Sequence, residues 1–121
     1  MKKRAALFLA TLLIAAGAGF AGDNPVVGAW KSMPDGRSVK IYSETHFTVV
    51  SSEADGTFRF AFAGEYVLKG NAVTEKIEKG SLPDAVGKEV THEFSISGDD
   101  WKSTVTHPDG TKNEEVWKRV E

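Results

Sequence analysis

Apolar and polar residues alternate along most of the chain beyond residue 25, and this period of two is the pattern of half-buried β-strands. The longest such run covers residues 57–68, where a row of aromatic side chains occupies one face. No convincing apolar stripe with the helical period of 3.6 extends beyond about two turns. The alternation predicts strands at residues 26–33, 37–43, 45–51, 57–68, 72–79, 88–97, 101–106 and 111–120.

Short turns rich in Gly, Asp and Pro separate the predicted strands, as at Pro34-Asp35-Gly36 and at residues 107–110. Short strands at this regular spacing are typical of an antiparallel meander. Eight strands can close into a barrel that side chains fill or that holds one small ligand. We therefore predict an all-β, eight-stranded antiparallel up-and-down barrel, with an open sandwich as the alternative. Gly64, in the middle of the longest run, predicts a bulge or a sharp bend.

The first 21 residues have the pattern of a signal peptide for the Sec export pathway. Lys2, Lys3 and Arg4 precede an apolar run over residues 5–20, and small residues stand just before Gly22. The run is short for a membrane span and polar sequence follows it; a retained membrane anchor is the alternative. We expect cleavage after residue 21 and one lipocalin-like domain over residues 22–121. The expected location is the periplasm or the exterior of a Gram-negative type of cell, with no membrane span after cleavage.

The composition excludes several ways of stabilising or using such a small domain. The chain contains no Cys, so neither disulfides nor a Cys-based metal site can support the core. A formal net charge of −2 argues against a nucleic-acid surface, which needs a clustered positive patch. His46, His92 and His107 lack the spacing that brings two metal ligands together locally. We expect neither a metal nor another cofactor.

The two ends of the chain carry motifs that resemble a known family. The last predicted strand is aromatic and charged and needs a partner, for which the first strand is the natural candidate. Gly28-Ala29-Trp30 and Arg119 resemble the signature of the calycin superfamily, the lipocalins and their relatives. Together with Gly64-Glu65-Tyr66, residues 74–78 and residues 115–120, they make the chain similar to small lipocalin-like domains of unknown function in secreted bacterial proteins.

The resemblance covers nearly the whole mature chain and implies a barrel in which Arg119 packs across Trp30. A guanidinium over an indole face contributes roughly 0.5–2 kcal/mol and would also cover one end of the barrel. The alternative is that Arg119 only pairs with Glu115 on its own strand, which contributes little if exposed. The family implies no established activity, and the lack of long loops argues against a deep, roomy cup. The structural signature that we expect consists of Gly28, Trp30, Glu115, Trp117 and Arg119.

Three polar residues lie on faces that are otherwise apolar, namely Glu75, His92 and Ser103. If these faces point inward, the polar groups must be paired, because an unpaired buried polar group is costly. One interpretation is a satisfied internal network, with Glu75 or Glu115 joined to Arg119 and His92 joined to a neighbour. The other is that they hold the polar end of a ligand in a mostly apolar pocket. The second interpretation predicts a lumen site formed by Phe58, Phe60, Phe62, Tyr66, Glu75, His92, Phe94 and Ser103.

The polar residues also include the types found in a hydrolytic triad, Ser103, His92 and Glu75. No nucleophile-elbow sequence supports that interpretation, and we expect no catalytic residues. The expected function is an exported lipocalin-like barrel that binds a small hydrophobic or amphipathic molecule in its lumen without catalysis. The alternative is an envelope or surface interaction module with a filled core that acts through its outer face.

Overall fold

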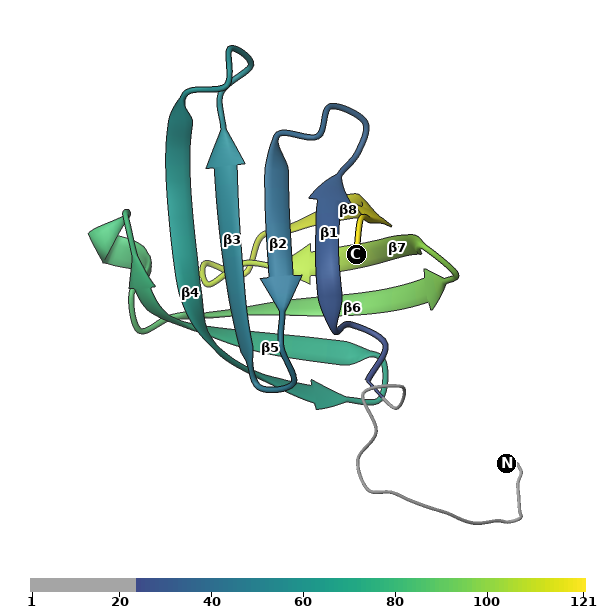
Figure 1. Cartoon of the computed structure of the whole chain (residues 1–121). Helices are drawn as coiled ribbons and strands as arrows, with labels where there is room; N and C mark the ends of the chain where they lie inside the picture. Colours follow the sequence, from purple (N-terminus) through teal and green to yellow (C-terminus); the bar gives the residue numbers. More distant parts are fainter. Residues whose placement is uncertain (1–23) are drawn as a thin grey trace, which may run out of the picture.

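Eight antiparallel strands follow one another in sequence order around a closed barrel (Figure 1). The computed structural model describes residues 24–121, so the expected signal peptide at residues 1–21 lies outside the described residues. The predicted up-and-down barrel is confirmed, and the open sandwich is wrong. The strands are β1 (Gly28–Ser32), β2 (Ser38–Tyr42), β3 (His46–Ser52), β4 (Phe58–Lys69), β5 (Ala72–Gly80), β6 (Glu89–Ser97), β7 (Asp100–Thr106) and β8 (Lys112–Arg119).

Within residues 24–121, the loop between β5 and β6 contains the one element that the alternation did not predict. It is a short 3-10 helix, η2 (Pro83–Ala85), with proline at its start. Proline suits this position because its fixed φ and missing N–H cost nothing in the first turn. Ala85 packs against the buried core, so the loop covers part of the barrel.

The barrel closes where the first strand meets the last. Trp30 on β1 lies opposite Arg119 on β8, and Ser32 lies opposite Trp117. This pairing confirms the predicted contact between the two ends of the chain. It also removes both sheet edges, which would otherwise expose unpaired backbone groups.

Gly64 lies at the point where β4 bends. The register between β4 and β5 shifts between Ala63 and Gly64. A Cβ atom on Gly64 would overlap the carbonyl oxygen of Lys76, so only glycine lets the two strands approach so closely. The predicted irregularity is confirmed, and Figure 1 shows β4 curving from the side of β3 towards β5.

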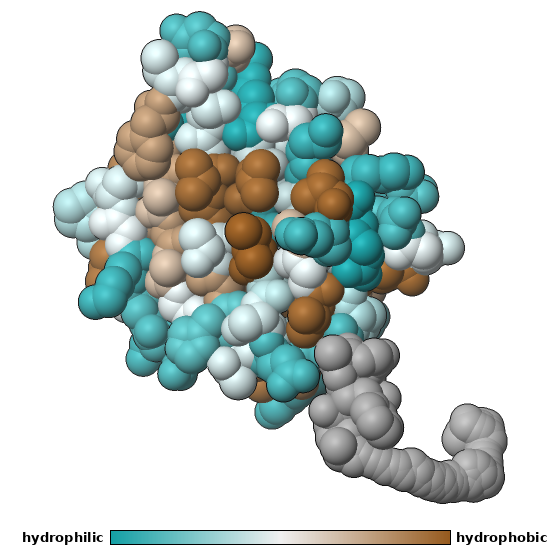
Figure 2. Space-filling model, viewed as in Figure 1, coloured by the Kyte–Doolittle hydropathy of each residue, from teal (hydrophilic) through white to brown (hydrophobic). Residues whose placement is uncertain are grey.

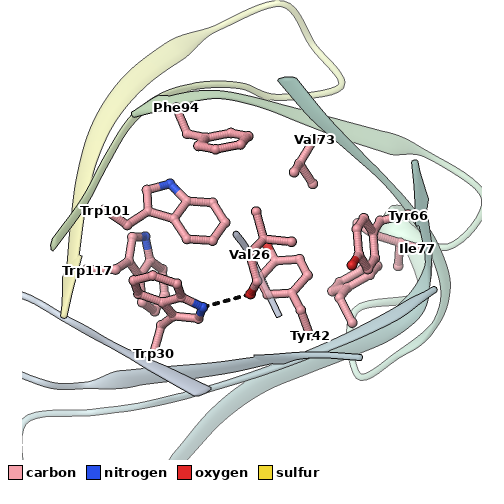
Figure 3. Packing of buried hydrophobic residues seen from close by; sticks show 10 residues of the cluster. Val26, Trp30, Tyr42, Tyr66, Val73, Ile77, Phe94, Trp101 and Trp117 are labelled. Atoms are coloured by element: carbon pink, nitrogen blue, oxygen red, sulfur yellow. Dashed lines mark hydrogen bonds between the residues drawn. The ribbon is translucent and has the colours of Figure 1, made fainter. Parts of the chain in front are cut away.

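Aromatic side chains fill one end of the barrel, which we call the closed end. It is the end where β1 and β7 begin and where β6 and β8 finish. Trp30 and Trp101 meet edge to face with ring centroids 5.0 Å apart, beside Trp117 (Figure 3). Val26 inserts between these indoles and Tyr42, and its carbonyl oxygen accepts a 2.9 Å hydrogen bond from Trp30 Nε1. The segment that precedes β1 therefore plugs this end.

In strand β2, two apolar side chains face outward and a lysine faces the interior of the barrel. Val39 and Ile41 point outward and are 39% and 52% exposed, whereas Lys40 points inward and is 2% exposed. Val39 lies opposite Val50 on β3, which is also exposed. Figure 2 shows apolar side chains gathered on the face of the barrel that carries these strands. The outer wall therefore has an apolar surface, and the interior receives a lysine.

Candidate functional site: a partly open cavity in the barrel

A cavity of about 160 Å³ occupies the other half of the barrel and is partly open to solvent. We call this the open end, where β4 begins and β7 finishes. Apolar side chains form most of its wall, and several ionisable groups reach its inner part. The apolar lining comprises Phe47, Val49, Phe60, Phe62, Ile77, Val90, Val105 and Trp117, and the polar lining comprises Ser38, Lys40, Glu75, His92, His107 and Glu115.

The structure places half of the expected lumen residues around this cavity. Phe60, Phe62, Glu75 and His92 line it. Alternation on β4, β5 and β6 brings these four side chains to the inner surface, as the sequence pattern predicts. Their role in binding a ligand stays a prediction.

The other expected lumen residues lie elsewhere. Phe58 is 62% exposed, because the register between β3 and β4 shifts at Ser52 and leaves this ring beyond the rim. Tyr66 and Phe94 belong to the aromatic core. The Tyr66 hydroxyl donates a 2.6 Å hydrogen bond to the Ser43 carbonyl and is thus used at the closed end. The inward-facing rings of the sequence pattern are therefore divided between a packed core and a cavity.

Ser103 is buried, but it does not line the cavity. It borders a shallow hollow over β6 to β8 instead. Its Oγ has no hydrogen-bond partner within residues 24–121, and neither ring nitrogen of His92 makes an aligned hydrogen bond there. A hydrolytic triad needs the serine hydroxyl bonded to the imidazole, and this arrangement lacks that bond.

Lys40 is the ionisable residue of the cavity that the sequence pattern did not single out. Its Cα lies opposite those of Trp30 on β1 and Val49 on β3, so all three side chains are on the inner surface. The signal was present in the pairing of β1 with β2, because a strand partner of a buried tryptophan must also face inward. The apolar residues on either side of it, Val39 and Ile41, face outward, so the hydrophobic pattern of β2 alone does not identify Lys40 as an inner residue.

The Lys40 amine is packed against aromatic rings. Nζ lies 3.3 Å from the centre of the Trp101 ring and 4.2 Å from that of Trp117. Among the described residues, it has no hydrogen-bond partner. Burial lowers the pKa of Lys40 to about 7, although the negative charges of Glu75 and Glu115 act in the opposite direction. A large fraction of the Lys40 side chains is therefore uncharged near neutral pH.

Glu75 is the centre of a buried polar network. The Tyr42 hydroxyl donates a short hydrogen bond to its Oε2, and His92 Nε2 lies 3.1 Å from its Oε1. Burial raises the pKa of Glu75, but the neighbouring His92, the Lys40 amine and the hydrogen bond from Tyr42 together lower it below its ordinary value. Burial and the Glu75 charge raise the pKa of Tyr42 well above 10.0. Glu75 is thus a carboxylate held by a neutral phenol.

Arg119 does not take part in this network, so the expected link from Glu75 or Glu115 to Arg119 is wrong. The Arg119 guanidinium lies 4.2 Å from the centre of the Trp30 ring and donates hydrogen bonds to the carbonyls of Val27 and Pro25. It closes the opposite end of the barrel. Glu115 instead accepts a 2.9 Å hydrogen bond from Trp117 Nε1.

No three His, Cys, Asp or Glu residues form a group that could hold a metal ion in the part of the chain that the structure describes. Across residues 24–121 there is also no helix of the length and hydropathy needed to cross a membrane.

Comparisons with protein-family models, curated proteins and solved structures found no match. The topology, an eight-stranded antiparallel barrel with its two end strands paired, is compatible with a lipocalin-like fold.

Proposed function

We propose that this chain is an exported, lipocalin-like binding protein of the calycin superfamily that holds one small, partly apolar molecule in its lumen without catalysis. The observation that carries the proposal is the partly open cavity, which combines apolar walls with buried polar groups at its inner end. This combination is typical of small-molecule sites. Export is supported by the signal-peptide pattern of residues 1–21.

The size of the cavity limits the part of the ligand that is enclosed. Its volume is about 160 Å³. An apolar cavity of about 150 Å³ encloses one molecule of the size of benzene. The enclosed group is therefore a single ring or a chain of about six carbons, and the rest of a longer ligand extends through the open end.

The polarity of the cavity indicates which end of the ligand enters first. Phe60, Phe62 and Val49 form apolar walls, whereas the Lys40 amine has no hydrogen-bond partner among the described residues. A buried donor gains most from a new acceptor when it has none. The ligand is thus an apolar chain or ring that carries a carbonyl or carboxylate oxygen, with this oxygen innermost.

Two neighbouring valines of β3 offer a matched test. Val49 lines the cavity opposite Lys40 and Phe62, whereas Val50 is 44% exposed on the outer surface. Val49→Trp should fill the lumen, and Val50→Trp should leave it open. We expect hexanoate and 1-hexanol to bind the natural protein and the Val50→Trp variant in calorimetric titrations, and to bind Val49→Trp at least about tenfold more weakly, a loss of 1.4 kcal/mol.

Equal affinities of the two folded variants would overturn the assignment of the site. Native mass spectrometry of protein purified from its own periplasm adds a second measurement. We expect a noncovalent small-molecule adduct that is lost on denaturation, and an N-terminus at Gly22. An unprocessed N-terminus would contradict export, while absence of both an adduct and probe binding would contradict lumen binding.

The outer surface favours a second candidate function, an interaction module of the cell envelope. Val39, Ile41 and Val50 form an exposed apolar surface on β2 and β3. Contiguous apolar surfaces of this kind often mark interaction sites. Ile41→Thr together with Val50→Thr should leave hexanol binding unchanged. If these substitutions abolish the biological activity while Val49→Trp does not, the second candidate replaces the first.

A further inference from the structure

Lys40 has the surroundings of a nucleophilic amine. Its side chain lines the cavity, and its Nζ is fully buried without a hydrogen-bond partner within the described part of the chain. An ordinary lysine is a poor nucleophile at neutral pH because a proton occupies its lone pair. Lysines that are desolvated in apolar pockets lose this proton readily and are the ones that form Schiff bases with carbonyl compounds.

We propose that Lys40 captures small apolar aldehydes reversibly as an imine inside the barrel. This inference rests on the proposed function, because it uses the same cavity and the same orientation of the ligand. It goes further in assigning a covalent bond, a reacting atom and a chemical class of ligand.

The chemistry needs no partner other than the aldehyde and water. The Nζ lone pair attacks the carbonyl carbon, a C–N bond forms, and a proton moves from nitrogen to oxygen to give a carbinolamine. The remaining proton on nitrogen is then transferred to the hydroxyl group, the C–O bond breaks, water leaves, and the C=N bond of the imine forms. Addition of water reverses both steps, so no oxidant or reductant is required. Water leaves and returns through the open end of the cavity.

The surroundings of Lys40 support each part of this reaction. Burial brings its pKa to about 7, against the pull of Glu75 and Glu115, so the unprotonated amine is abundant at neutral pH. His92 lines the same cavity, and an imidazole can accept or donate a proton. Phe60 and Phe62 line the wall that receives the apolar tail of the aldehyde.

Other lysines provide an internal comparison. Lys102 on β7 and Lys118 on β8 are exposed on the outside of the barrel. An unperturbed lysine with a pKa near 10.4 is unprotonated in only about one molecule in 2,500 at pH 7. Reaction at Lys40 should therefore exceed reaction at the exposed lysines, despite its restricted access.

The test is reductive trapping with hexanal and sodium cyanoborohydride at neutral pH, followed by peptide mapping. We expect the hexyl label at Lys40 to exceed that at any exposed lysine by more than about tenfold. Excess 1-hexanol should reduce this label by competing for the cavity. Lys40→Met and Lys40→Arg should both lose it, and Lys40→Arg keeps a cation at the position if Lys40→Met fails to fold. The control variant Lys102→Met should keep it.

The outcomes separate this inference from the proposed function. If 1-hexanol or hexanoate binds the natural protein but the label is spread over the exposed lysines, imine formation is overturned while lumen binding stands. If the probes do not bind and Lys40 is not labelled, both are overturned. A label at Lys40 that 1-hexanol does not reduce would place the reaction outside the binding cavity and would also overturn the inference.

Discussion

The amine nitrogen of Lys40 lies 3.3 Å from the centre of the Trp101 ring, at the boundary between the packed core and the cavity. The indole face attracts the charged form of the amine, whereas burial favours the neutral form. Neither interaction gives the amine an ordinary hydrogen-bond acceptor. This contact links the stability of the barrel to pH and leaves the amine available to a ligand.

The first prediction concerns the pH dependence of stability. Lys40 has a pKa of about 7 in the folded protein and 10.5 ordinarily, so between these values the unfolded chain binds more protons. The free energy of unfolding should therefore rise with pH over this range, by at most about 1.4 kcal/mol per pH unit. Urea unfolding between about pH 7 and 9 measures this slope. In this range the unfolded chain keeps the Tyr42 hydroxyl protonated, so Tyr42 does not contribute to the slope.

Two variants provide the comparison for this slope. Lys40→Met should remove the Lys40 contribution, because no amine titrates in the interior. Lys102→Met should keep it, because Lys102 is exposed on the outer surface. If the slopes of Lys40→Met and Lys102→Met are the same, Lys40 is not the group responsible.

The second prediction concerns the buried carboxylate. Glu75→Met leaves the Tyr42 hydroxyl without its acceptor and removes the charge that faces His92. Removing one partner of a buried charged pair typically lowers the free energy of unfolding by about 3–5 kcal/mol. For Glu75→Met we expect a loss near the lower limit of this range. Glu78→Met on the same strand changes an exposed residue and should cost less than about 0.5 kcal/mol.

Urea unfolding at neutral pH measures both variants, and hexanoate titration gives a separate readout. If Glu75→Met is as stable as Glu78→Met, the network does not depend on the carboxylate. If it instead becomes more stable and binds hexanoate unchanged, Glu75 has no part in the site.

The third prediction concerns the contact that covers the closed end. Arg119 stacks on Trp30 and donates hydrogen bonds of 2.9 and 3.0 Å to the carbonyls of Val27 and Pro25. Arg119→Met removes the stacking and both hydrogen bonds and should destabilise the barrel by about 2–3 kcal/mol. Lys118→Met, next to it on the exposed face, should change stability by less than about 0.5 kcal/mol. Equal unfolding midpoints for the two variants would show that the stacked guanidinium contributes nothing.

The fourth prediction concerns the glycine of the first-strand motif. Gly28 has a φ of +135°, and a Cβ there would lie 2.7 Å from Arg119 Nη1 and overlap the Glu121 carbonyl oxygen. Gly28→Ala should therefore combine backbone strain of about 1–3 kcal/mol with displacement of Arg119. Gly56→Ala is the matched control, since Gly56 also has a positive φ but nothing lies within 4 Å of its Cβ position. Thermal unfolding should show the larger loss for Gly28→Ala, and the reverse order would rule out a steric cause.

Local alternation and turn chemistry were sufficient to predict the strands and their order. A period of two determines which side chains share a face, and short turns determine that consecutive strands pair. Gly64 could be predicted as an irregularity because a glycine weakens the middle of a strand and often marks a bulge or a close approach of two backbones. The contact of Arg119 with Trp30 followed from the resemblance and from the need of the last strand for a partner.

The sequence by itself therefore determined the strands, their order and the joining of the two ends, because these depend on neighbouring residues and on the pairing rules of sheets. Alternation cannot say which face of a strand is inside; closure of the barrel placed Lys40 inside and Val39 outside. It also cannot say how far the core extends. Val26, Trp30 and Trp101 fill only the closed end, so Phe60 and Phe62 line a cavity while Phe94 is packed in the core. These features depend on register and side-chain volume around the whole ring of strands, which only the folded barrel brings together.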